Sequence, residues 1–157
     1  MIRTTLAALG GVGLIGGVLA VAALADQKPG QLLPHDVPEA VAAGAEIYQA
    51  QCASCHASDL GGEPNWRAPK DSGRLPAPPH DETGHTWHHP DPQLFMLTKY
   101  GTAAVVGNGY ESDMPAFEGT LNDREILQVL AYIKSTWPEG IIARHDQMNA
   151  AAAEQAQ

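Results

Sequence analysis

The stretch QCASCHASDLGG, residues 51–62, contains both cysteines of the 157-residue chain, and a histidine follows the second one directly. In an oxidising compartment such a pair would ordinarily form a disulfide. A thioredoxin-like dithiol would follow a buried strand, but the sequence before Gln51 has no strand pattern. A zinc site would need a second pair of ligands. The C-x-x-C-H pattern instead predicts a covalent c-type haem, attached through thioethers to Cys52 and Cys55, with His56 as an axial ligand of the iron.

The composition limits what else the chain can do. A chain of 157 residues with 44% hydrophobic residues can build one modest core. Only 6% of the residues are aromatic, so this core would gain from a bulky apolar cofactor. The formal net charge of −9 argues against nucleic acid as a partner, because binding phosphates requires positive charge.

The first 25 residues predict a segment that targets the membrane. Arg3 precedes an uncharged apolar run over residues 4–25. As a helix this run would be about 33 Å long, enough to cross a hydrocarbon layer of ~30 Å. The sequence ALA at residues 23–25 resembles a cleavage site, so a signal peptide is the alternative. We favour a retained anchor in the bacterial cytoplasmic membrane, with everything after Asp26 facing the periplasm; a cleaved protein would be soluble there.

The rest of the chain divides into a linker at residues 26–35, a haem domain at residues 36–138 and a C-terminal tail at residues 139–157. Proline, glycine and polar residues make the linker suitable as a short tether. In the tail we expect a short helix over residues 141–149, with His145 at its surface, followed by disordered alanines and glutamines.

The haem domain shows helical patterns and no competing strand pattern, so the predicted fold class is all-α. Its helices are expected at residues 36–51, 91–101 and 122–137. Asp36, Asp91 and Asn122 are the predicted N-caps, and for the first and third of them a glutamate three residues later completes a capping box.

A haem iron held by His56 needs a sixth ligand, and two methionines are candidates. Met96 lies within the second predicted helix and is expected in its core. Met114 lies in an irregular segment, where Pro115 prevents helix formation and holds Met114 extended. We therefore predict that Met114 is the second axial ligand.

The segment between the haem motif and the second helix is unusually rich in histidine. Four imidazoles could surround a copper or zinc ion there: His80, His85, His88 and His89. The alternative, which we favour, is a polar loop packed beside the haem. A proline carbonyl in PAPP, residues 76–79, is expected to accept the outward N–H of His56. Trp66, Trp87 and Tyr110 could donate hydrogen bonds to haem propionates or simply pack around the cofactor.

The order of these features resembles the small monohaem cytochromes c of the His/Met type: a helix with Gly44 and Tyr48, then CASCH, a mid-chain helix, MPAF and LAYIKSTW. The resemblance covers residues 36–138. It implies a cytochrome c fold whose first and last helices cross, with Gly44 and Tyr48 meeting Tyr132, around one haem that cycles between Fe(II) and Fe(III). The segment LPAPPHDETGHTWHHPD, residues 75–91, resembles a bacterial, often membrane-tethered subgroup.

The expected function is electron transfer and not catalysis. Two protein ligands would fill both axial positions of the iron, and a thioether favours Fe(II). The expected partners are membrane redox proteins of a respiratory or photosynthetic chain, with a quinol-oxidising complex as donor and a terminal oxidase or similar protein as acceptor. The alternative is a copper-handling or copper-sensing module that uses the histidines of residues 80–89.

Overall fold

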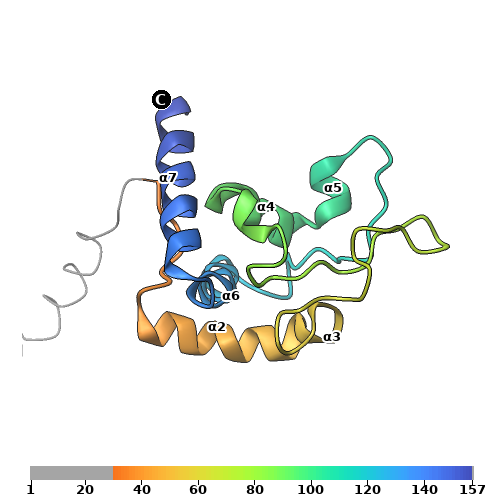
Figure 1. Ribbon diagram of the computed structural model, residues 1–157, viewed down its shortest axis with the longest axis horizontal. Coiled ribbons are helices and arrows are strands. Elements are labelled where there is room, and N and C mark those ends of the chain that lie inside the picture. The colour runs from red at the N-terminus through yellow and green to blue at the C-terminus, as the bar shows by residue number, and fades with distance from the viewer. Residues whose placement is uncertain (1–29, 157) are drawn as a thin grey trace, which may run out of the picture.

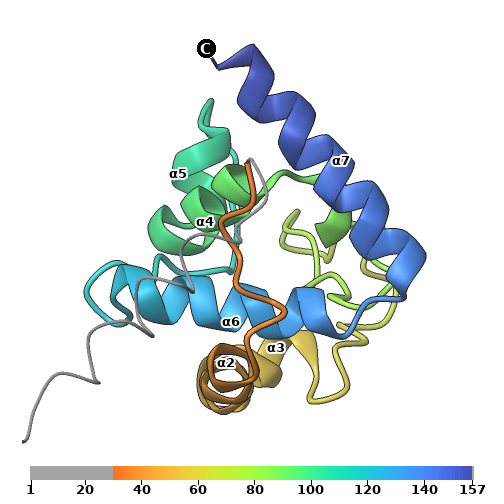
Figure 2. The same cartoon turned by 90° about the vertical axis from the view of Figure 1, so that its left-hand side faces the viewer.

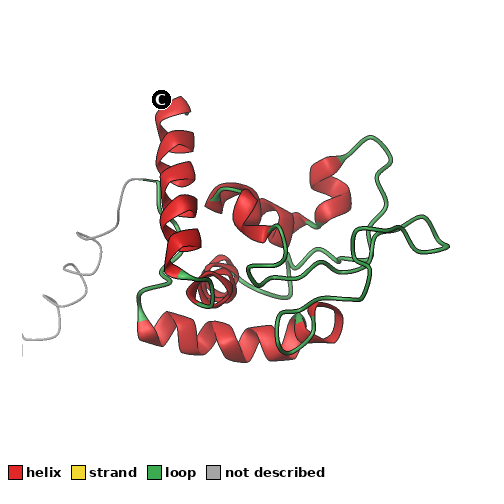
Figure 3. Cartoon of the chain, in the orientation of Figure 1, coloured by secondary structure: helices red, strands yellow, loops and turns green. Residues whose placement is uncertain are grey.

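The computed structural model describes residues 30–156 and shows helices joined by long loops (Figures 1 and 3). The helices are α2 (Pro38–Gln51), α3 (Ala53–His56), the 3-10 turn η1 (Thr86–His88), α4 (Asp91–Tyr100), α5 (Thr102–Val106), α6 (Asp123–Ser135) and α7 (Glu139–Gln155). Within these residues the only β-type pairing is an isolated bridge between Glu118 and Leu121, which confirms the predicted all-α class.

The helices α2 and α6 cross in close contact, and Figure 2 shows α6 lying across the end-on α2. A Cβ atom at Gly44 would collide with the backbone carbonyl of Gln128 and would lie 2.9 Å from Cβ of Tyr132. One turn further along α2, the rings of Tyr48 and Tyr132 are 5.4 Å apart. This confirms the expected crossing, in which a glycine lets two helix backbones approach.

The start of α2 differs from the prediction. The N-cap is Val37, and Pro38 occupies the first helical position, so Asp36 does not begin a capping box. Proline at this position is favourable because its fixed φ suits the first turn and its missing N–H would have had no helical partner. The buried face consists of Ala40, Gly44 and Tyr48: Gly44 lies where the α6 backbone comes closest, and the Tyr48 ring packs beside this point against Tyr132.

Helix α6 forms as its sequence predicts. Asn122 accepts the N–H of Glu125 at 3.0 Å, and the Glu125 carboxylate accepts the N–H of Asn122 at 2.8 Å, which completes the capping box. Its apolar stripe, which includes Ile126, Val129 and Leu130, is buried in the core.

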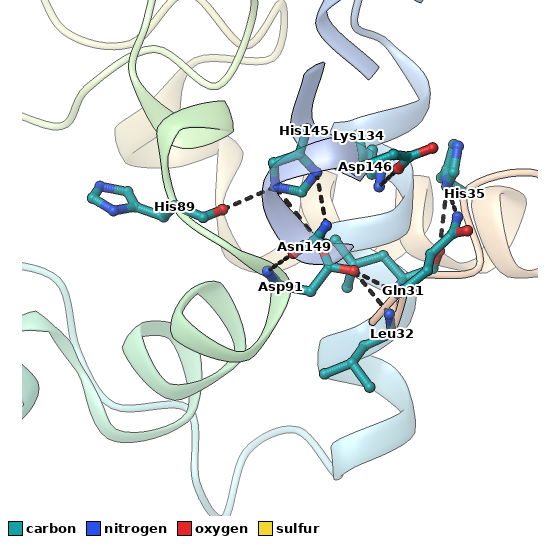
Figure 4. Close-up of polar contacts among 10 residues, drawn as sticks. Gln31, Leu32, His35, His89, Asp91, Lys134, His145, Asp146 and Asn149 are labelled. Carbon is teal, nitrogen blue, oxygen red and sulfur yellow. Dashed lines mark hydrogen bonds and ion pairs between the residues drawn. The ribbon is translucent and has the colours of Figure 1, made fainter. Parts of the chain in front are cut away.

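Asp91 is the first residue of α4 and not its N-cap, which is Pro90. Its carboxylate is fully buried and accepts the N–H groups of Leu32 at 2.8 Å and Leu33 at 3.2 Å (Figure 4). The N–H of Asp91 donates to Oδ1 of Asn149 at 2.7 Å, and Nδ2 of Asn149 donates back to Asp91 Oδ1 at 2.9 Å. The side chain therefore joins α4 to α7 and to the segment before α2, so it is not available to cap.

The C-terminal tail is a long helix and not a short one with a disordered end. Helix α7 spans Glu139–Gln155, and His145, expected at the surface, is fully buried on it. Nε2 of His145 donates to the His89 carbonyl at 2.9 Å, and the ring packs edge-on against Trp137. Below it, the buried Nζ of Lys134 pairs with Asp146 at 2.6 Å. These polar contacts fix α7 to the domain, which a pattern of alanines and glutamines does not reveal.

The predicted linker, residues 26–35, does not extend as far along the chain as expected. Leu33 is 1% exposed and belongs to the hydrophobic core, and the side chains of Gln31 and His35 are joined by a 2.8 Å hydrogen bond. Its second half is thus part of the domain. The predicted membrane segment, residues 1–25, lies outside the described residues, and no helix among residues 30–156 has the length and apolar character needed to cross a bilayer.

Candidate functional site

Cys52, Cys55 and His56 lie on one turn where α2 passes into α3. Cys52 ends α2, with its N–H bonded to the Tyr48 carbonyl at 2.9 Å, and it also precedes the first residue of α3. The N–H groups of Cys55 and His56 both bond to the carbonyl of Cys52. Both cysteines are free thiols, Cys52 half-buried and Cys55 exposed. A helical turn thus presents two thiols and one imidazole from a rigid backbone.

The Cys52 thiol does not have the lowered pKa of a redox-active cysteine. Burial, with a smaller contribution from Cys55, raises the pKa of the Cys52 thiol to about 11. Reactive cysteines in thioredoxin-like motifs have a lowered pKa, because the thiolate is the nucleophile. Cys52 therefore lacks the lowered pKa that a thioredoxin-like nucleophile needs.

Tyr48 holds this turn in place by hydrogen bonds, a role that its expected contact with Tyr132 did not suggest. Its hydroxyl donates to the carbonyls of Ala57 at 2.9 Å and His56 at 3.2 Å, and its side chain is fully buried. Tyr48 lies one helical turn before Cys52 on the same helix. The hydrogen bonds therefore fix the chain just after the histidine relative to α2.

His56 is held in the form that a metal requires. Its Nδ1 lies 2.8 Å from the Pro78 carbonyl, which can only accept, so Nδ1 carries the proton and Nε2 keeps its lone pair. Burial lowers the pKa of His56, so the ring is neutral near pH 7. The predicted contact with PAPP is confirmed. Glycine at position 62 lets the chain pass close to this proline segment, because φ there is +70° and a Cβ atom would lie only 2.5 Å from the nitrogen of Pro79.

Met114 lies in the loop between α5 and α6, as predicted. Its Sδ accepts a hydrogen bond from Thr102 Oγ1 at 3.3 Å, and its N–H donates to Ser112 Oγ at 3.1 Å. Met96 is 44% exposed on α4 and not in the helix core as expected, because α4 buries the face that carries Leu94 and Thr98. Both contacts of Met114 involve hydroxyl groups that the sequence alone did not single out.

The four histidines of the long loop do not form a common site. The His80 ring stacks on His56 at 3.9 Å, and its Nδ1 bonds to Thr86 Oγ1 at 2.8 Å. His85 stacks on Trp66, and His88 stacks on Trp87. Among residues 30–156, no three histidine, cysteine, aspartate or glutamate side chains come together to hold a metal ion. The structure thus favours the polar loop, as expected, over the alternative of a second metal site, since three of the four rings each stack on another aromatic ring.

The predicted propionate donors differ in their surroundings. The indole N–H of Trp87 donates to the Glu82 carbonyl at 3.3 Å, so its partner in this structure is a backbone carbonyl and not the haem propionate considered above. Tyr110 is 38% exposed in the loop that leads to Met114. Trp66 is half-buried, with the Arg67 guanidinium 4.0 Å above its ring. None of the three is bound to the Cys52–His56 turn by a hydrogen bond that the structure shows in the described residues.

A comparison with known protein families bears on whether Cys52, Cys55 and His56 bind a haem. Residues 41–137 match the family model for cytochrome c. The chain belongs to the cytochrome c family. A cytochrome c domain implies a covalently bound c-type haem, and the two free thiols with the adjacent imidazole at Nε2 supply the chemistry for attaching it. A search of solved structures found no match for this cytochrome c.

Proposed function

We propose that this cytochrome c is a one-electron carrier whose haem iron is held by His56 and Met114. The observation that carries the proposal is the Cys52–His56 turn, with Nδ1 of His56 bound to Pro78 and Nε2 left as a ligand. The bound haem supplies reversible one-electron chemistry. The chain holds the imidazole in one tautomer and orientation, and the loop after α5 supplies a thioether.

The ligand set supports transfer of electrons and not catalysis at the metal. A histidine and a methionine together would fill both axial positions, so O2 or peroxide would find no open site. A thioether is a soft ligand that favours Fe(II) and raises the reduction potential. Met114 is suited to this role because it is half-buried and its sulfur contacts only a hydroxyl among the interactions that the described residues show.

The test is to replace each methionine in the haem-loaded protein. Met114→Ala should abolish the weak near-infrared sulfur-to-iron charge-transfer band of the ferric protein and lower the reduction potential. Met96→Ala is the matched control, because Met96 is exposed on α4, and both properties should stay unchanged. A band that survives in Met114→Ala would rule out Met114 as the ligand.

We place the carrier on the periplasmic side of the bacterial membrane, between a quinol-oxidising complex and a terminal oxidase or similar acceptor. The apolar residues 4–25, with Arg3 before them, support this placement. Since the N–H groups of Leu32 and Leu33 are bonded to Asp91, a retained anchor that ends at residue 25 would be joined to the domain by residues 26–31, a tether of at most about 21 Å. A mature N-terminus at Asp26 in the soluble fraction, measured by mass spectrometry, would contradict the anchor.

A further inference from the structure

The loop that follows α3 is closed at its base by a pair of reciprocal hydrogen bonds. The N–H of Glu63 donates to the Ala77 carbonyl at 2.8 Å, and the N–H of Ala77 donates to the Glu63 carboxylate at 2.6 Å. Ala77 directly precedes Pro78, whose carbonyl holds His56. The base of the loop is therefore fixed beside the first axial ligand of the proposed haem site.

The tip of the same loop is a tight turn that brings two cations together. The N–H of Lys70 donates to the Arg74 carbonyl at 2.9 Å, and Gly73, with φ of +82°, donates back to the Lys70 carbonyl at 2.8 Å. These bonds bring the backbones of Lys70 and Arg74 close together. Figure 1 shows the segment between α5 and α6 passing beside this yellow-green loop.

The cations meet the residue next to Met114. Arg74 Nη1 lies 2.7 Å from Asp113 Oδ1, and Lys70 Nζ lies 3.7 Å from Asp113 Oδ2. Arg74 also reaches Glu111 at 3.5 Å, and Lys70 also pairs with Glu63 at 3.1 Å. One charged network thus runs from the base of the loop to the methionine segment.

We propose that Lys70 and Arg74 are positioning residues that hold the Met114 loop closed over the iron, so that residues 63–78 form an electrostatic strap between the two axial ligands. This inference rests on the proposed ligation by Met114. The strap contacts the His56 side through Pro78 and the Met114 side through Asp113. Loss of its ion pairs should therefore free the methionine segment and leave the contact between His56 and Pro78 intact.

The strap should have a measurable but modest effect. Its charged side chains are between 38% and 67% exposed, and ion pairs in contact with solvent are weakened by water and salt. An external ligand can bind the iron only when Met114 has left it, so its apparent affinity reports the fraction of open molecules. For a pair of this kind we expect a change of about threefold in that fraction.

The experiment is a titration of the ferric, haem-loaded protein with imidazole. Arg74→Gln and Asp113→Asn should each raise the apparent affinity for imidazole about threefold, and the effect of the double variant should be smaller than the product of the two single effects, because both changes remove the pair between Arg74 and Asp113. Arg67→Gln is the matched control. It removes the same charge from the same loop, but Arg67 stacks over Trp66 and should leave the affinity unchanged.

Salt provides a second measurement that needs no variant. Raising the ionic strength to about 0.5 M should increase the imidazole affinity of the unaltered protein, and it should have little effect on the double variant. Equal imidazole affinity in Arg74→Gln, Asp113→Asn and Arg67→Gln, with no salt effect, would overturn the strap. A ferric protein without the sulfur-to-iron band would instead overturn the proposed ligation by Met114, so the two failures are distinguishable.

Discussion

Asn149→Ala should destabilise the protein strongly, although Asn149 lies far from the haem motif in the sequence. The side chain is 2% exposed and joins Asp91 to His145 (Figure 4). Its removal takes the acceptor at 2.7 Å from the N–H of Asp91, and the donor at 3.3 Å from Nδ1 of His145. A buried polar group that loses its partner costs about 1–3 kcal/mol, and the truncation also leaves a small cavity. We therefore expect a loss of about 3 kcal/mol in the free energy of unfolding, toward the lower end of the combined cost because water can enter the space.

The assay is urea unfolding of the haem-loaded protein, followed by circular dichroism. Gln147→Ala is the control, since Gln147 is exposed on the same helix, and its free energy of unfolding should change by less than about 0.5 kcal/mol. Native-state hydrogen exchange adds a local readout. Asn149→Ala should accelerate exchange at the amides of Leu32 and Leu33, because their acceptor Asp91 is no longer held in place. A loss below about 1 kcal/mol, with these amides still protected, would refute the reasoning.

Two further predictions concern the helix crossing and the buried histidine. Gly44→Ala should lower the free energy of unfolding by about 1–3 kcal/mol despite the better helix propensity of alanine, because the added methyl meets the backbone of Gln128. Gly140→Ala, in open space on α7, should stabilise slightly, and equal thermal shifts for the two variants would contradict the steric argument. Burial lowers the pKa of His145; the hydrogen bond to the His89 carbonyl and the carboxylates of Asp91 and Asp146 oppose this shift, and Lys134 adds to it. The unfolded chain therefore binds the proton first, so stability should fall as pH drops below about 6.5, and His145→Gln should flatten that dependence in urea unfolding measured from pH 7.5 to 5.

The local features of the sequence were sufficient to predict the haem motif, the all-α class and the capping box of α6. Each of these depends on residues close together in the chain, such as Cys52, Cys55 and His56 on one turn or Asn122 and Glu125 three positions apart. The contact of His56 with PAPP was also predictable, because a metal-binding imidazole needs an acceptor at its other nitrogen and the carbonyls of PAPP are nearby in sequence. The choice of Met114 as ligand follows from its place before Pro115 and stays a prediction.

The features that the sequence did not determine depend on residues far apart in the chain. Asp91 has the residue type of an N-cap. Its carboxylate instead accepts hydrogen bonds from the N–H groups of residues 32 and 33 and from the Asn149 amide, and Pro90 occupies the N-cap position of α4. The same long-range contacts bind the end of the predicted linker, through Leu32 and Leu33, and the tail helix α7, through Asn149, to the domain. The charged contact between Arg74 and Asp113 spans 39 positions and has no local signal. Short-range periodicity and capping chemistry therefore specify the elements, whereas buried polar groups acquire their partners only when the tertiary structure removes them from water.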